Sequence, residues 1–96
     1  MSVLELNREI TEEFLVQNGW NLDNLIKSEK ILIDRYVRIV KIARKNNKRY
    51  PYERCGAYLI KVQNEWVLRI PFYNITFTPH DIDDLFAFLS SKGFTY

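Results

Sequence analysis

The segment 45–54 contains the residues whose types point most clearly to a chemistry. It combines basic and aromatic side chains, namely Lys45, Lys48, Arg49, Tyr50, Tyr52 and Arg54. Cationic side chains contact phosphates, and tyrosine rings stack on unpaired bases. A polar stretch of this length between two apolar ones is typical of a surface loop. We therefore expect either a nucleic-acid-binding loop or a solvated loop whose tyrosines cover part of a sheet.

A second polar group has the composition of a metal site or of a catalytic acid and base. It consists of His80, Asp81, Asp83 and Asp84. In a helix only His80 and Asp84 would share a face, whereas a tight metal site needs three converging ligands. We therefore expect the acids to complement the positive end of a helix, without a bound metal.

The single cysteine, Cys55, has no activating motif around it in the sequence. With three glycines and one histidine, the chain also lacks a phosphate-binding glycine loop, a serine elbow and zinc-finger spacing. We expect a non-enzymatic protein that has no catalytic residue and no cofactor. A lone thiol cannot form an intrachain disulfide and fits a reducing compartment, so we expect a cytoplasmic protein.

Three aromatic residues near the carboxyl end are candidates for a contact surface. Phe88 lies off the apolar stripe of the last predicted helix, and Phe94 and Tyr96 follow that helix. Exposed aromatic side chains often anchor protein interfaces. They predict binding to a protein partner or to a second copy of the chain. Ordinary packing onto the sheet is the alternative.

Composition limits the classes of protein that remain. The 96 residues are 47% hydrophobic, which is enough for one core without disulfides, and we expect a single domain over 1–96. The net charge of +2 is too small to indicate nucleic-acid binding by itself. No apolar run approaches the length of a membrane span, and the first residues lack the pattern of a signal peptide. We expect no association with membranes.

The last element is predicted to be an amphipathic helix over 79–92. Thr78 is the expected N-cap, Pro79 the first helical residue and Gly93 the stop. Apolar residues with helical spacing form one stripe: Ile82, Leu85, Phe86 and Leu89. Near the other end of the chain, Thr11 and the following acids predict a short helix that ends at Asn18-Gly19.

The central part of the sequence predicts strands. Residues 30–45 are rich in β-branched side chains and favour one long or bent strand, with a helix as the alternative. Segments 57–62 and 65–72 are separated by Gln63-Asn64, which is the spacing of a two-residue hairpin. A short strand is expected at 75–77, and 20–30 is interpreted as a loop or a short helix. The predicted fold class is α+β, with an antiparallel sheet of three or four strands and both helices packed on one face.

Two stretches of the sequence have patterns that occur together in other proteins. Residues 10–20 predict a short opening helix that ends in Asn-Gly-Trp, and residues 80–86 open a closing helix with the pattern His, any residue, aliphatic, any residue, polar, Leu, aromatic. Both are similar to a loose group of small uncharacterised proteins from bacteriophages and bacterial mobile elements. The group has no assigned activity, so this resemblance implies a source and no chemistry.

Two functional hypotheses follow from these observations. The first is a small non-enzymatic protein that binds another protein or itself, and that modulates a host or defence factor if it is encoded by a phage or mobile element. The second is a nucleic-acid-binding module that uses the basic, tyrosine-containing loop 45–54.

Overall fold

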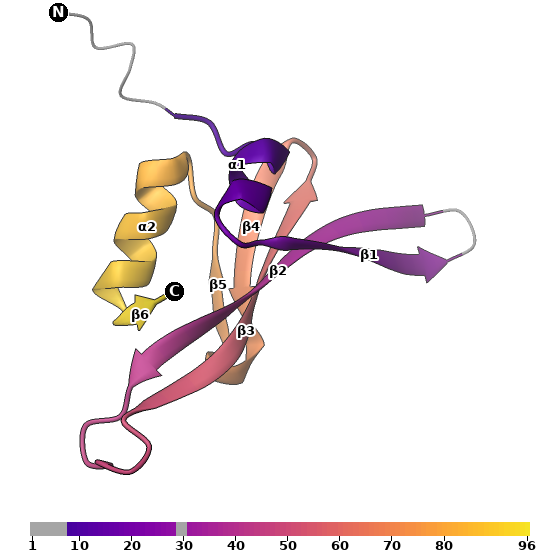
Figure 1. Cartoon of the computed structure of the whole chain (residues 1–96). Coiled ribbons are helices and arrows are strands. Elements are labelled where there is room, and N and C mark those ends of the chain that lie inside the picture. Colours follow the sequence, from indigo (N-terminus) through magenta and orange to yellow (C-terminus); the bar gives the residue numbers. More distant parts are fainter. Residues whose placement is uncertain (1–7, 29–30) are drawn as a thin grey trace, which may run out of the picture.

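The computed structural model describes residues 8–28 and 31–96. The stretch 1–7, which entered the argument about a signal peptide, lies outside the described residues. Helices and strands follow one another in this order (Figure 1): α1 (Glu12–Gln17), β1 (Asn21–Ser28), β2 (Ile31–Ala43), β3 (Tyr52–Val62), β4 (Glu65–Ile70), a 3-10 helix (Pro71–Tyr73), β5 (Ile75–Phe77), α2 (Ile82–Ser91) and β6 (Phe94–Thr95).

The strands of the described residues form one antiparallel sheet with the order β1-β2-β3-β4-β5, and β6 pairs with β2. The α+β class is therefore confirmed, but the sheet has more strands than the three or four expected. One addition is β1, in the segment predicted to be a loop or short helix. Asn21, Asp23 and Asn24 favour turns in isolation, yet the long β2 supplies pairing partners for residues 21–26 and for Ser28.

The prediction of one long strand in the segment 30–45 is confirmed by β2, and the helical alternative is wrong. Residues 35–43 of β2 pair with β3, while the opposite edge pairs with β1 up to Val37 and with β6 at Lys41 and Ile42. In Figure 1 the β1–β2 and β2–β3 hairpins extend in different directions from the centre of the sheet. β2 thus joins three other strands.

The hairpin predicted at Gln63-Asn64 is confirmed, since β3 ends at Val62 and β4 begins at Glu65. Both turn residues have left-handed backbones, with φ of 49° and 68°. This is the conformation of the type I′ turns that match the twist of paired strands. The expected alternation ends at Ile70, because Pro71 begins a 3-10 helix, and Phe72 is 67% exposed instead of entering the core.

α1 begins and ends where the sequence predicted. The hydroxyl of Thr11 accepts a hydrogen bond of 3.1 Å from the backbone N–H of Phe14, and Gly19 follows the helix with φ of 88°. Leu15 is fully buried and Phe14 packs against the core.

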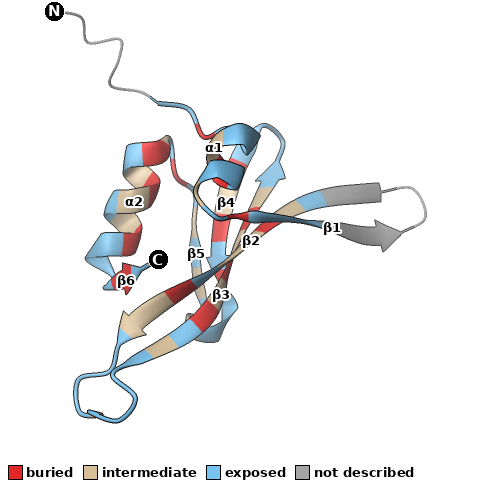
Figure 2. Ribbon diagram, in the orientation of Figure 1, coloured by how far each residue is buried: buried red, intermediate tan, exposed pale blue. Residues whose placement is uncertain are grey.

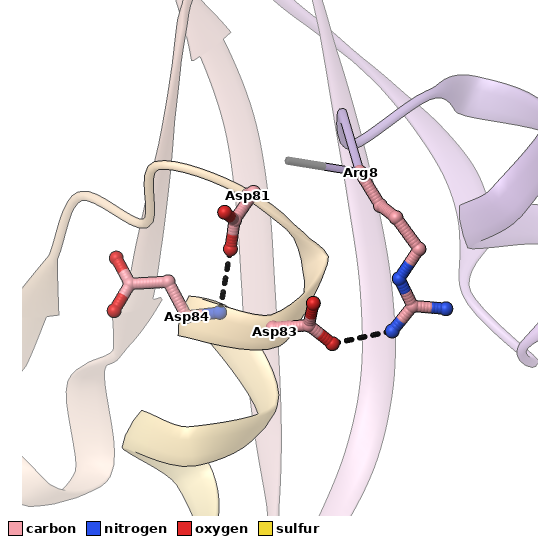
Figure 3. A network of polar contacts seen from close by, with 4 residues as sticks. All are labelled: Arg8, Asp81, Asp83 and Asp84. Carbon is pink, nitrogen blue, oxygen red and sulfur yellow. Dashed lines mark hydrogen bonds and ion pairs between the residues drawn. The ribbon is translucent and has the colours of Figure 1, made fainter. Parts of the chain in front are cut away.

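α2 begins later than predicted. Its N-cap is Asp81, whose carboxylate accepts a hydrogen bond of 2.8 Å from the backbone N–H of Asp84, as Figure 3 shows. The cap predicted at Thr78 is therefore wrong, because the carboxylate three residues further on takes this role. Gly93, with φ of 85°, follows the end of the helix as expected. Arg8 forms an ion pair with Asp83 in the first turn.

The core lies on one face of the central strands, as the distribution of buried residues in Figure 2 indicates. Tyr36 and Val40 on β2 are opposite Leu59 and Cys55 on β3, and all four are buried. The buried residues of both helices belong to the same core: Leu15, Ile82, Leu85 and Leu89.

The alternate residues of β3, β4 and residues 35–43 of β2 point to the other face, and none of these is buried. We call this surface the open face. Among the described residues, neither helix has the length and apolar character needed to span a membrane.

Candidate nucleic-acid interface

The basic segment forms the end of the β2–β3 hairpin, which projects from the sheet in Figure 1. β2 ends at Ala43 and β3 begins at Tyr52, so the connecting loop spans 44–51 and is exposed along nearly its whole length (Figure 2). Tyr52 and Arg54 were expected in the loop but lie on β3. Their side chains are thus placed by strand pairing, because the register sets Arg54 opposite Lys41.

Local hydrogen bonds order the loop. The backbone N–H of Arg44 donates to the carbonyl of Pro51 at 2.8 Å, which closes the base of the loop. The side-chain oxygen of Asn47 accepts from the backbone N–H groups of Arg49 and Tyr50, at 3.1 and 2.9 Å. This is the Asx-type turn that asparagine favours. It directs the backbone toward β3 just before the two tyrosines.

Both tyrosines are exposed, and each has at least one cation close to its ring. Tyr50 is 57% exposed, and the guanidinium of Arg49 lies 5.6 Å from its ring centroid. Tyr52 is 41% exposed, with the Lys41 ammonium at 5.0 Å and the Arg54 guanidinium at 5.4 Å. These distances are within the range of cation–π contacts. The end of the hairpin therefore presents aromatic rings and positive charge together.

The hydroxyl of Tyr52 also accepts a hydrogen bond of 3.1 Å from Nη2 of Arg54. This hydrogen bond, with the charges of Arg54 and Lys41, lowers the pKa of Tyr52 below its usual value of 10. A lowered phenol pKa is the mark of a positive local potential. The same potential attracts phosphate groups.

A concavity of about 550 Å³ lies between the loop and β3. Its lining residues are Arg44, Arg49, Tyr50, Pro51, Tyr52, Glu53 and Arg54. Glu53 is the one acid in this lining, and its carboxylate accepts a hydrogen bond from the hydroxyl of Tyr73 and lies 4.0 Å from the guanidinium of Arg44. Lys45 and Lys48 are exposed on the loop but do not line this concavity.

The three aromatic residues expected to form a protein contact surface pack largely against other residues of the same chain. Phe94 is 4% exposed and belongs to the core, so it is not available to a partner. Phe88 stacks on Phe77 with 3.9 Å between the ring centroids. The ring of Tyr96 is half-buried, with the guanidinium of Arg38 3.8 Å from its centroid. β6, which the sequence did not indicate, holds Phe94 against β2.

Tyr96 is held further by the hydrogen bond that Nε1 of Trp20 donates to its hydroxyl at 3.2 Å. Burial raises the pKa of Tyr96, and the Trp20 and Arg38 contacts partly oppose that shift. These contacts give Tyr96 a structural role.

The acidic group at the start of α2 has the structural role predicted for it. Asp81 caps the helix, and Asp84 accepts a hydrogen bond of 2.9 Å from the backbone N–H of His80. Within the part of the chain that the structure describes, no three His, Cys, Asp or Glu side chains gather where they could hold a metal ion. Cys55 is buried, and this burial raises the pKa of its thiol, which disfavours the reactive thiolate.

Comparisons of the chain with models of protein families, with curated proteins and with solved structures found no significant match. The end of the hairpin is therefore interpreted from its own chemistry.

Proposed function

We propose that this chain is a non-catalytic nucleic-acid-binding module whose primary contact is the end of the β2–β3 hairpin. The observation that supports the proposal most strongly is the exposure of Tyr50 and Tyr52, each with a cation beside its ring. A stacked base would cover these rings, and the neighbouring cations would contact its phosphates. Single-stranded nucleic acids offer both groups at once.

The tyrosine rings and the cations would each contribute to the free energy of binding a nucleic acid. Stacking a base on an aromatic side chain contributes about 1 to 3 kcal/mol. The cations add a salt-dependent term, because each neutralised phosphate releases counterions. Arg44, Arg49 and Arg54 line one concavity, and they can act on the same stretch of phosphate backbone.

The direct test is the affinity of the chain for labelled, mixed-sequence RNA and single-stranded DNA, measured by fluorescence anisotropy at several salt concentrations. Contacts with about three to five phosphates predict that the logarithm of affinity falls with the logarithm of salt at a slope of about −2 to −3.5. Arg49→Gln should reduce this slope by about 0.7, and Tyr50→Ala should lower affinity about tenfold at an unchanged slope. Lys92→Gln, an equal charge change at the end of α2, should alter neither quantity. A chain that binds neither polymer at low salt would contradict the proposal.

A second candidate function is binding to a protein partner or to a second copy of the chain. It is favoured by exposed apolar side chains outside the residues first proposed, among them Phe72 at 67%, Val16 at 59% and Ile39 at 52%. Exposed aromatic side chains often anchor such contacts. The sequence resemblance suggests that such binding would modulate a host or defence factor. Phe72→Ser should then abolish capture of the partner in a pull-down, while a strictly monomeric chain that captures nothing would rule the role out.

A further inference from the structure

The outer row of β3 extends the hairpin surface across the open face. Alternate residues of a strand point the same way, so Tyr52, Arg54, Gly56 and Tyr58 succeed one another on this side. The neighbouring row on β2 places Lys41 opposite Arg54 and Ile39 opposite Gly56. The rings of Tyr52 and Tyr58 thus stand at the two ends of a row that has a cation and a glycine between them.

Gly56 has no side chain, and a hollow lies beside it, although the phenol of Tyr58 leans over the glycine itself. A concavity of about 700 Å³ lies at this point, and it is lined by Arg38, Ile39, Lys41, Arg54, Cys55, Gly56 and Tyr96. Three of these residues are basic and none is acidic. The concavity shares Arg54 with the concavity at the end of the hairpin. The two are therefore neighbours along β3.

Tyr58 is the next residue of the outer row after Gly56 and lies outside the lining of the hollow. An added Cβ at Gly56 would lie 3.0 Å from the hydroxyl of Tyr58, so the phenol leans over the glycine. The guanidinium of Arg35 lies 4.6 Å from the centroid of the Tyr58 ring, and Arg69 on β4 is opposite Tyr58 in the register. An aromatic ring with adjacent cations is repeated here, as at the end of the hairpin.

Charge is distributed unevenly between the two sides of the sheet. Register places Arg35, Lys41, Arg54 and Arg69 on the open face, where the described acids are Asp23, which is paired with Arg35, and Glu65. The acids of α1 and α2 lie on elements that pack in the core on the other side. The open face therefore offers a positive surface to a polyanion.

From this geometry we infer that a single strand of nucleic acid continues from the hairpin over the hollow at Gly56 to Tyr58. The inference rests on the proposed function and specifies its ligand. Six residues separate Tyr52 from Tyr58, or about 20 Å of strand. This length corresponds to about six stacked nucleotides, and to fewer if the strand is extended. A duplex does not fit this surface, since its bases are already stacked on one another and cannot lie on the tyrosines.

The test compares oligonucleotides of about three and about nine nucleotides, as RNA and as DNA of the same sequence, with wild type and with Gly56→Val. Gly56 has extended backbone, and the contact made by a new side chain is with the flexible end of Tyr58, so the variant should fold. A side chain at Gly56 displaces the phenol of Tyr58 and narrows the hollow, so it should weaken binding of the longer oligonucleotide about tenfold, leave the shorter one unchanged and preserve the salt slope. Thr76→Val on β5 is the control, because it places a valine at an exposed position outside the hollow by exchanging a hydroxyl for a methyl group.

A second variant keeps the test decisive if Gly56→Val lowers the melting temperature. Arg69→Gln, at an exposed position, should reduce the salt slope of the longer oligonucleotide by about 0.7 and leave that of the shorter one unchanged. Tighter binding of RNA than of DNA would indicate a contact with the 2′-hydroxyl. Equal binding would indicate that the bases and phosphates are recognised. Both results support the path.

Other results would overturn the inference. If both oligonucleotides bind and neither variant changes the affinity for the longer one, the path is wrong while the hairpin site stands. If a duplex binds as tightly as a single strand, the path is likewise wrong while the hairpin site stands. If no oligonucleotide binds, the proposed function fails and the path fails with it. A dimer of the chain that Gly56→Val dissociates would instead identify a second copy as the occupant of the open face.

Discussion

The hydroxyl of Tyr73 donates a hydrogen bond to the carboxylate of Glu53. It connects the 3-10 helix after β4 to the first residues of β3, next to the basic loop. Tyr73 also packs edge-on against Phe94, with ring centroids 5.5 Å apart. The base of the projecting hairpin is thus tied to the core through one tyrosine.

The Tyr73 contact predicts a pH dependence of stability. The hydrogen bond to Glu53, with burial and the Glu53 charge, raises the pKa of Tyr73 from 10 to about 12. The folded state therefore holds this proton more tightly than the unfolded state does. The resulting stabilisation is complete below pH 10 and is lost as the pH rises toward about 12. Urea unfolding of Tyr73→Phe should give lower stability than wild type at neutral pH and a shallower loss in the alkaline range. Parallel curves for the two proteins would refute the assignment.

The core of α2 predicts a large difference between two neighbouring substitutions. Leu85 is fully buried, and Leu85→Ala should lower the free energy of unfolding by about 2 to 4 kcal/mol. Asp83 is exposed and forms a surface ion pair with Arg8, so Asp83→Ala should cost far less. Thermal or urea unfolding of both variants measures the difference. Equally mild effects would show that α2 does not pack as described.

The capping of α2 can be tested by two further substitutions. Asp81→Ala removes the acceptor for the backbone N–H of Asp84 and should cost about 1 kcal/mol. Thr78→Ala lies before the helix and should leave stability almost unchanged. Unfolding by urea distinguishes the two positions, and the reverse order of effects would place the cap at Thr78.

The electrostatics of the hairpin can be measured without any ligand. Ultraviolet titration should show that Tyr52 ionises below the usual pKa of 10. Arg54→Gln removes both the hydrogen bond and the nearest charge, so it should raise this pKa toward 10. Lys61→Gln, an equal charge change elsewhere on β3, serves as the control. A Tyr52 pKa that is unaffected by Arg54→Gln would mean that the two side chains do not interact in solution.

Local chemistry explains which parts of the fold were predictable. The type I′ turn at Gln63-Asn64 and the stops at Gly19 and Gly93 depend on backbone conformations that neighbouring residues determine. By contrast β1 and β6 depend on pairing with distant parts of β2. Asn21 and Asp23 favour turns, and only the free edge of β2 makes them a strand.

The candidate site was likewise predictable where it depends on local composition and not where it depends on strand pairing. The composition of 45–54 indicated phosphate and base contacts, and the exposed Tyr50 and Tyr52 retain that chemistry. The role suggested for Gly56, Tyr58 and Arg69 could not be seen in the sequence, because it depends on register across three strands. Phe94 was predicted to be part of a contact surface but is buried. Its burial could not be predicted, because it follows from the pairing of β6 with β2.

The pairing of β6 with β2 has a consequence for the order of folding. The β1–β2, β2–β3 and β3–β4 hairpins connect segments close in sequence and can form early, whereas closure of Lys41 and Ile42 by Phe94 and Thr95 joins segments separated by more than half of the chain. Until that closure, this edge of β2 stays unpaired and can accept a strand from another molecule. Amide hydrogen exchange at the β2–β6 pairing should therefore be faster than at the β2–β3 pairing, and the nascent protein is most prone to aggregate during this interval.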